Sequence, residues 1–318
     1  MKTKSPVVAD VTSTLYRSLG MEMTLRMAKS LIEGYNINER MGFPPSVPVP
    51  AQDAANRVVM DLFDAGLFLE LVEWLVKVDH HGFMGKQLPI MGIDEIIEGV
   101  KADGYLLDAE SGTFYEDSRK QRTRGWGRLR SGNEYPITLL HFDIARNSSL
   151  VRANAAQDVE RVYDTLRSLF TWIVEKRRGR VWDWQGDGGL AAFQYGHPNM
   201  SAVLCGIELL NELCVFNITE NPLDREILVR TAVHAGFIRY TEVPSDLMRD
   251  EVVKEIEEIE HEYTPINSLA VSATVAPYVD GVIKDCLVPI DVSSPWQILC
   301  YSIASKSAGN KPGRGKRP

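Results

Sequence analysis

Apolar residues in the first third of the chain recur every three to four positions, which is the spacing of one face of an α-helix. One such stretch covers residues 9–34, a second covers 51–78 and a short third covers 93–100. The proline-rich segment GFPPSVPVP at 42–50 separates the first two stretches, because proline cannot continue a helix. Residues 1–108 are therefore predicted to form a small helical domain, and they contain no catalytic constellation.

A polar segment follows at residues 109–134. From residue 110 it reads ESGTFYEDSRKQRTRGWGRLRSGNE and is rich in charged residues and glycine. This composition is typical of an exposed connection between domains. The segment is predicted to be a linker.

From residue 135 the pattern changes to short apolar runs alternating with amphipathic stretches. The apolar runs predict strands at 135–142, 180–185, 190–194, 227–234 and 287–290, with 237–240 forming a hairpin partner across Ala235-Gly236. The amphipathic stretches predict helices at 157–176, 200–216, 248–263 and 266–279. The order β-α-β-β-α-β, with additions, is that of a ferredoxin-like α+β fold. This second domain is expected to cover residues 135–305.

Charge and composition exclude several classes of function. The formal net charge of −8 does not suit a protein that binds a nucleic-acid backbone. The basic stretch 306–318 is predicted to be a disordered, solubilising tail. The N-terminus lacks the apolar core of a signal peptide, and we expect no segment to insert into a membrane. A cytoplasmic protein is predicted.

Cysteine usage agrees with a reducing compartment. None of the four cysteines belongs to a CxxC pair, so neither a zinc site nor a redox motif is indicated. Each lies in or beside an apolar run and is expected to be a small core residue. They are Cys205, Cys214, Cys286 and Cys300.

Two aspartates stand at positions suited to chemistry. Asp143 ends an apolar strand in HFDIARNSS, and Asp187 lies at the tip of a predicted hairpin in WQGDGGLAAF. Taken alone, an Asp after a strand often caps a turn, and Asp-Gly is a common hairpin pair. In a β-α-β-β unit, however, the first strand and this hairpin pack side by side, so that both carboxylates converge at one sheet edge. Two Mg²⁺ or Mn²⁺ ions are predicted there.

The segment that follows the first aspartate is a candidate phosphate site. Residues 144–149 lie between the strand and a helix, where backbone N–H groups bind phosphate oxygens. The predicted substrate-binding residues in it are Ala145, Arg146 and Asn147.

The motifs FDIARNS, GRVWDWQGDGGLAAF and VRTAVHAGF together resemble the catalytic domain of class III nucleotidyl cyclases, over roughly residues 135–291. The resemblance implies that Asp143 and Asp187 are catalytic metal ligands, with the carbonyl of Ile144 as an added ligand. It also implies a nucleoside triphosphate substrate and a head-to-tail homodimer with active sites at the interface.

The chain departs from this family at two substrate-binding positions. The base-selecting position, usually Lys in adenylate cyclases and Glu in guanylate cyclases, is Asp183, between two tryptophans. In the family's late helix an Asn precedes an Arg by four residues. Asn267 is the candidate for the Asn, but Val271 stands four residues later, and an alternative register offers Ala270 and Thr274. The substitutes for the Arg are Arg146, Arg230 and Arg239.

These departures look like the pyrimidine cyclases of bacterial antiphage Pycsar systems, which make cyclic UMP or cyclic CMP and so activate a separate effector protein. The resemblance implies UTP, or else CTP, as substrate. An adenylate or guanylate cyclase with atypical base contacts and a catalytically inactive cyclase-like regulatory module are the alternatives. The helical domain is expected to sense a signal or bind a partner, or to dimerise. The charged helix 248–263 either shapes the nucleotide entrance or is a solvated helix with one apolar stripe.

Overall fold

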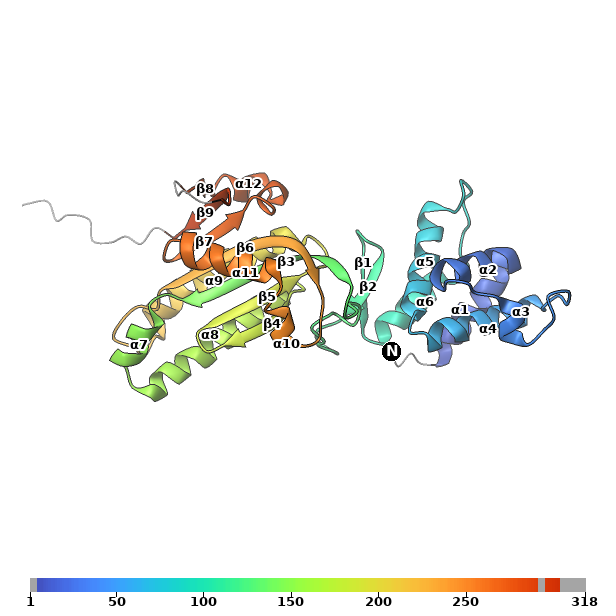
Figure 1. The fold of residues 1–318 in the computed structure, drawn as a ribbon, viewed down its shortest axis with the longest axis horizontal. Coiled ribbons are helices and arrows are strands. Elements are labelled where there is room, and N and C mark those ends of the chain that lie inside the picture. Colours follow the sequence, from blue (N-terminus) through green and yellow to red (C-terminus); the bar gives the residue numbers. More distant parts are fainter. Residues whose placement is uncertain (1–4, 291–294, 304–318) are drawn as a thin grey trace, which may run out of the picture. The chain divides into compact units, whose positions relative to one another are not determined.

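The computed structural model describes residues 5–290 and 295–303, which form two compact units, Met1–Arg128 and Leu129–Pro318 (Figure 1). The expected basic tail 306–318 lies outside the described residues. Each unit has its own hydrophobic core cluster. The units are described separately below.

The first unit is mainly helical, which confirms the predicted helical N-terminal part. Its apolar stripes pack on one another around buried residues such as Val58, Leu71 and Ile96. Its elements are α1 (Ser5–Thr14), a π-helical turn η1 (Leu15–Leu19), α2 (Gly20–Leu31), α3 (Ile37–Met41), α4 (Ala51–Asp64), α5 (Phe68–His81), α6 (Ile93–Ala102), β1 (Tyr105–Asp108) and β2 (Thr113–Glu116).

Much of the predicted linker 109–134 is instead folded into this unit. Strands β1 and β2 form an antiparallel hairpin, and Phe114 and Trp126 are fully buried. Glu73 of α5 accepts a hydrogen bond from the backbone N–H of Phe114 and pairs with Arg128 at 2.9 Å. Isolated aromatic residues in a polar sequence leave no periodic signal, which is why the pattern indicated a linker.

The second unit contains a seven-stranded sheet with the order β4-β5-β3-β6-β7-β9-β8. Its described elements are β3 (Glu134–Ile144), α7 (Asn147–Ala153), α8 (Ala156–Lys176), β4 (Arg180–Gln185), β5 (Gly188–Phe193), α9 (Pro198–Thr219), β6 (Val229–Arg239), α10 (Pro244–Leu247), α11 (Glu251–Glu258), η2 (Ile259–Tyr263), β7 (Ser268–Ser272), η3 (Ala276–Tyr278), α12 (Gly281–Lys284), β8 (Val288–Pro289) and β9 (Ile298–Ser302).

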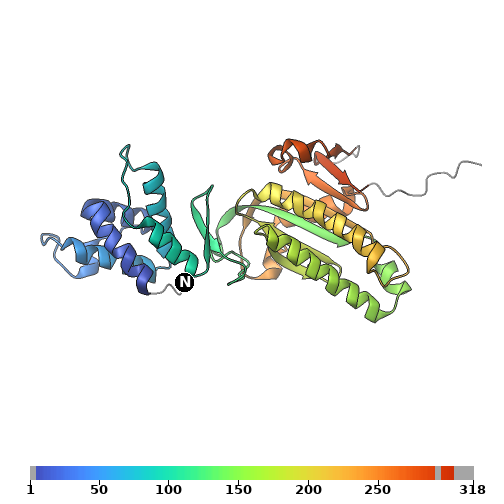
Figure 2. The ribbon, with the colours of Figure 1, turned by 180° about the vertical axis from the view of Figure 1, so that it is seen from behind.

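The predicted α+β class and its ferredoxin-like core are confirmed. The elements β3, α8, β4, β5, α9 and β6 follow the β-α-β-β-α-β order, and the four strands pair antiparallel as β4-β5-β3-β6. Helices α8 and α9 cover one face of the sheet (Figure 2), and α11 packs against β6 and β3. Because side chains alternate along a strand, Phe142 points into the α8–α9 core and Asp143 points to the opposite face.

The predicted hairpin at Ala235-Gly236 is wrong, because β6 runs without interruption from Val229 to Arg239. Gly236 does not form a turn but allows close packing against α11. A Cβ atom at Gly236 would lie 2.7 Å from a methyl group of Val252 on α11. The glycine therefore lets the helix approach the strand closely.

The predicted helix 266–279 is also wrong. Residues Ser268–Ser272 form β7, which pairs parallel with β6 and antiparallel with β9. Every residue of this strand is buried, so it lacks the period-2 alternation by which strands are usually predicted. Asn267 therefore precedes a strand and not the late helix of the expected pattern.

Helix α9 needs separate mention because, by length and composition alone, it could cross a membrane. No other helix among the described residues 5–290 and 295–303 meets that test. In the fold α9 packs against the sheet and contributes residues such as Val203, Leu209 and Leu213 to the core. This burial accounts for its apolar composition, although the sequence analysis expected no such segment.

We expect Gly236→Ala to destabilise the second unit by about 1–3 kcal/mol, because the added methyl group overpacks the contact with Val252. Gly281→Ala is the matched control, since nothing lies within 4 Å of its Cβ position. Denaturant unfolding of the full chain measures both. Equal free energies of unfolding for Gly236→Ala and the parent would contradict the packing argument.

Candidate active site

Asp143 lies one residue before the end of β3, on the sheet face opposite α8 and α9. Its backbone pairs with Arg230 of β6, and the neighbouring Phe142 pairs with Gly189 of β5. The side chain of Asp143 is 27% exposed. It is therefore held on a central strand and remains accessible from solvent.

The hairpin between β4 and β5 brings the second aspartate to the first. Gly186 and Asp187 form its two-residue loop, and Gly186 has a φ of +55°, as the first position of a tight hairpin loop often requires. A Cβ atom at Gly188 would lie 2.9 Å from the carbonyl oxygen of Phe142 and 3.3 Å from Oδ1 of Asp143. The absence of a side chain at Gly188 thus lets the loop carrying Asp187 approach Asp143. The hairpin that carries Asp187 thus passes beside the strand end that carries Asp143.

The electrostatics of the site favour a cation. The pKa of Asp143 is raised to about 6, first by burial and then by the negative charges of Glu260 and Asp187, against the opposing effects of His141 and Arg230. A carboxylate that is disfavoured by its acidic neighbours gains stability when a positive ion binds beside it. The charge of the site therefore suits metal binding.

A small pocket opens beside Asp143. Its volume is about 200 Å³. Asp183 and Gln185 of β4 line one part of it, and Met248 and Glu257, before and within α11, line another. Asp183 accepts a hydrogen bond of 2.7 Å from Nε2 of Gln185. The structure thus brings the predicted base-selecting residue to the same pocket as Asp143.

The residues after Asp143 continue past the strand into α7. Ile144 is buried at the end of β3, and the N–H of Ala145 donates to the carbonyl of Leu228. Arg146 is exposed with a left-handed backbone (φ +60°), and Oδ1 of Asn147 accepts a hydrogen bond from the Tyr163 hydroxyl. This segment follows Asp143 directly, and the phosphate-binding role assigned to it stays a prediction, since α7 is a short helix of seven residues.

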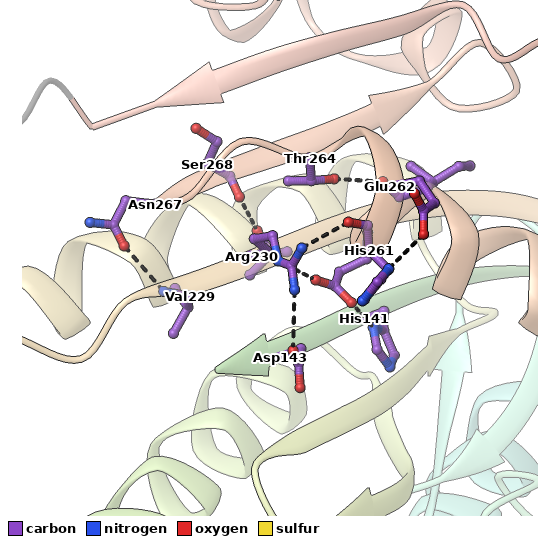
Figure 3. A network of polar contacts seen from close by, with 12 residues as sticks. His141, Asp143, Val229, Arg230, His261, Glu262, Thr264, Asn267 and Ser268 are labelled. Carbon is purple, nitrogen blue, oxygen red and sulfur yellow. Dashed lines mark hydrogen bonds and ion pairs between the residues drawn. The ribbon is translucent and has the colours of Figure 1, made fainter. Parts of the chain in front are cut away.

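Asn267 is not among the residues that line the pocket of Asp143. Its Oδ1 accepts from the N–H of Val229 at 3.1 Å, and its own N–H donates to the carbonyl of Val229 at 2.7 Å (Figure 3). It has a φ of +58°. These contacts fix the start of β7 to the start of β6.

The three candidate arginines lie in different places. Arg230 stands beside Asp143, with Nη2 at 3.7 Å from Oδ2. Arg239 lies nine residues along the same strand, roughly 30 Å away at about 3.3 Å per residue, and its Nε donates to the carbonyl of Gly132. Arg146 is exposed at the start of α7. Arg230 is therefore the cation that the fold places at the carboxylate.

Two acidic residues at this site, Glu257 and Glu260, are not among the predicted site residues. They belong to the charged segment 248–263, for which both an entrance-shaping role and a solvated helix were considered. Glu257 lines the pocket, and Glu260 is only 3% exposed. A signal for Glu260 was present, because it follows buried Ile256 by four residues and so falls on the apolar stripe.

The donor set fits a hard divalent cation. Within residues 5–290 and 295–303 the structure shows no group of three or more His, Cys, Asp or Glu residues arranged around a metal position. Mg²⁺ and Mn²⁺ are commonly held by one or two carboxylates, with phosphate oxygens and water completing the shell. Asp143 and Asp187, brought together at Gly188, supply such a pair.

Comparison with known proteins gives structural likeness only. No family model and no curated protein matches the chain. Among solved structures it is similar to the adenylyl cyclase CyaB from P. aeruginosa (16% identity, TM-score 0.46, 56% of this chain and 98% of that one). It is also similar to an adenylate/guanylate cyclase/hydrolase from Silicibacter pomeroyi (17%, 0.44, 54% and 98%) and to the monomeric guanylyl cyclase domain of a RhoGC fusion protein from Blastocladiella emersonii (14%, 0.45, 54% and 98%). Identities and TM-scores this low do not establish a family, so the functional argument rests on the site geometry.

The raised pKa of Asp143 gives a pH prediction. A proton and a divalent cation compete for this carboxylate, so Mn²⁺ affinity is expected to rise up to about tenfold per pH unit below pH 6 and to level off above it. Titration of free Mn²⁺ by electron paramagnetic resonance measures the affinity.

The raised pKa of Asp143 also determines whether the stability of the metal-free fold rises or falls with pH. Because the folded-state pKa of Asp143 lies above its ordinary value of 3.8, ionising Asp143 costs the metal-free fold stability as the pH rises from about 4 to about 6. Mn²⁺ should therefore raise Tm more at about pH 7.5 than at about pH 5. Asp143→Asn should weaken binding and abolish the pH dependence. Equal Mn²⁺ affinity of the parent protein at both pH values would contradict the assignment.

Proposed function

We propose that the second unit is a metal-dependent nucleotide cyclase, which converts a nucleoside triphosphate to its 3′,5′-cyclic monophosphate and pyrophosphate. The observation that carries this proposal is the approach of Asp143 to the Asp187 hairpin at Gly188, on the edge of a pocket. Two carboxylates beside a cavity are the donor set that Mg²⁺ or Mn²⁺ uses with a triphosphate. The second unit is also similar in fold to adenylyl and guanylyl cyclase structures.

In the proposed reaction the 3′-oxygen of the ribose attacks the α-phosphorus. The bond between that phosphorus and the oxygen bridging to the β-phosphate breaks, pyrophosphate leaves with the electron pair, and the 3′-hydroxyl proton passes to solvent. Two divalent cations would supply Lewis acidity at the 3′-oxygen and at the phosphates. Asp143 and Asp187 would hold them, with the carbonyl of Ile144 as a further ligand. The chain's part is to position these oxygens on a rigid strand and a tight hairpin.

The pyrimidine preference is part of this proposal and rests on Asp183. This carboxylate lies in the pocket, at the position where the resembling cyclases carry Lys or Glu, and one of its oxygens is engaged by Gln185. A carboxylate accepts a hydrogen bond from the N3–H of uracil, whereas N3 of cytosine is itself an acceptor and only its N4 amino group donates. A carboxylate accepts from either donor, so Asp183 fits both pyrimidines, and UTP is proposed ahead of CTP only as the first candidate to test.

The biological setting is proposed on the resemblance alone. The cyclic nucleotide would act as a second messenger in bacterial antiphage defence and activate a separate effector protein in the cytoplasm. A head-to-tail homodimer would complete the active sites. The helical first unit would either sense the signal or contribute to dimerisation.

The direct test is incubation of the purified full chain with each labelled nucleoside triphosphate and Mn²⁺, followed by chromatography of the products. Cyclic UMP is expected as the main product. Conversion of ATP or GTP alone would remove the pyrimidine proposal and leave the cyclase proposal standing. Binding of nucleotides without any product would instead favour an inactive regulatory module, for which the backbone-bound amide of Asn267 is the supporting observation.

Asp143→Ala and Asp187→Ala are each expected to lower turnover on the order of a thousandfold, because metal-derived stabilisation of several kcal/mol is lost at about 1.4 kcal/mol per tenfold. Asp164→Ala on the exposed side of α8 is the matched control and should retain turnover. Circular dichroism checks that all three variants fold. Full activity in either site variant would contradict the assigned roles.

A further inference from the structure

We propose that Arg230 and Glu260 form a charge-compensated pair beside Asp143, in which Glu260 preserves the affinity of that carboxylate for the metal. In this pair Arg230 fixes one oxygen of the carboxylate, and Glu260 offsets the positive charge that would otherwise repel the cation. The proposal rests on the proposed metal-dependent function. Both residues are positioning residues, since they act through Asp143.

The guanidinium group of Arg230 is held at three places (Figure 3). Its Nη1 donates to the carbonyl of His261 at 2.8 Å, its Nε lies 2.9 Å from Oε1 of Glu260, and its Nη2 lies 3.7 Å from Oδ2 of Asp143. The contact with Glu260 is an ion pair without the direction of a good hydrogen bond. Because the side chain is only 18% exposed, this positive charge is weakly screened by water.

The two oxygens of Asp143 face different neighbours. Oδ1 lies on the side of Gly188, where the Asp187 hairpin approaches, and Oδ2 faces Arg230. A cation shared by the two aspartates therefore binds on the Oδ1 side. Arg230 holds the carboxylate from the other side and does not occupy the metal position.

Holding a carboxylate with an arginine also has an electrostatic cost for metal binding. A positive charge within a few ångströms of Asp143 repels a divalent cation at the same carboxylate, and partial burial strengthens that repulsion. Glu260, with its side chain 4% exposed, places a negative charge against Arg230 and cancels much of this effect.

The position of Glu260 is set by the chain geometry. It follows α11 in the π-helical turn η2, and its Oε2 lies 3.5 Å from Nδ1 of His141 on β3. A buried carboxylate is retained only when paired. A purely structural role for the pair predicts loss of stability when either partner is removed, with no change in the Mn²⁺ affinity of the folded protein. The charge-compensation role predicts a specific pattern of affinities.

The experiment measures Mn²⁺ binding to the purified full chain without nucleotide, by electron paramagnetic resonance of free Mn²⁺. Glu260→Gln is isosteric and leaves Arg230 uncompensated, so binding is expected to weaken at least about tenfold. The double variant Arg230→Gln/Glu260→Gln removes both charges and should return to within about threefold of the parent protein. Glu262→Gln is the matched control, because Glu262 is exposed and pairs with His261, and its Mn²⁺ affinity should not change.

Thermal unfolding establishes which variants fold. If Glu260→Gln does not fold, the Mn²⁺ affinity of Arg230→Gln is the test. An affinity equal to or higher than that of the parent supports the proposal, and a lower affinity overturns it. If Glu260→Gln folds and binds Mn²⁺ as the parent does, or if the double variant is as weak as Glu260→Gln, the proposal is overturned.

The outcomes also separate this proposal from the proposed function. If the parent protein turns over a nucleoside triphosphate but Glu260→Gln binds Mn²⁺ as tightly as the parent, the charge-pair proposal is wrong and the cyclase proposal still stands. If the variants show the expected Mn²⁺ affinities but the protein converts no nucleoside triphosphate, the cyclase proposal is wrong and the charge-pair proposal still stands. A parent protein that binds no Mn²⁺ overturns both.

Discussion

The candidate site depends on the position of β3 between β5 and β6. This pairing places Phe142 opposite Gly189 and Asp143 opposite Arg230, so the carboxylate lies between a hairpin without side-chain bulk and a cation. A slip of one residue in either ladder would turn Asp143 into the apolar core beneath α8 and α9. The apolar alternation of β3, with Leu140 and Phe142 buried against the helices, fixes the register and thereby aims the carboxylate.

The opposite face of the sheet is covered by α11, which packs on β6 and β3 and is also joined to the sheet by polar contacts. Nε2 of His234 on β6 lies 3.0 Å from Glu255, and Nδ1 of the same ring lies 3.0 Å from the hydroxyl of Ser272 on β7. Burial lowers the pKa of His234, which favours the neutral ring and a hydrogen-bonded role. These contacts fix the helix that carries Glu257 to the pocket, so packing at β6 and β7 determines the shape of the site.

The sequence predicted the parts of the site whose local signals agree with the fold. The apolar run before Asp143 and the Gly-Asp-Gly-Gly hairpin both have strong local patterns, and the structure brings them together at Gly188. Prediction from the sequence failed where a strand is buried on both faces, and where a residue is buried by contacts with residues far away in the sequence. Strand β7 is buried throughout and so lacks alternation, and Asn267 was assigned to a helix that the chain does not form. Glu260 falls on the apolar stripe that begins in α11, but its pairing with Arg230 and His141 is long-range and is not encoded in local spacing.

The balance of charge at the site makes metal and substrate interdependent. Asp143, Asp183 and Glu257 line the pocket, while Arg230, which lies beside Asp143, is already paired with Glu260. A triphosphate carries several negative charges, and entering such a pocket alone would place like charges together at low dielectric. Divalent cations bound between them would offset the negative charge of both the carboxylates and the phosphates. Under the proposed function, the acidic pocket therefore favours a nucleotide that binds together with its cations over a metal-free triphosphate, before any base contact is made.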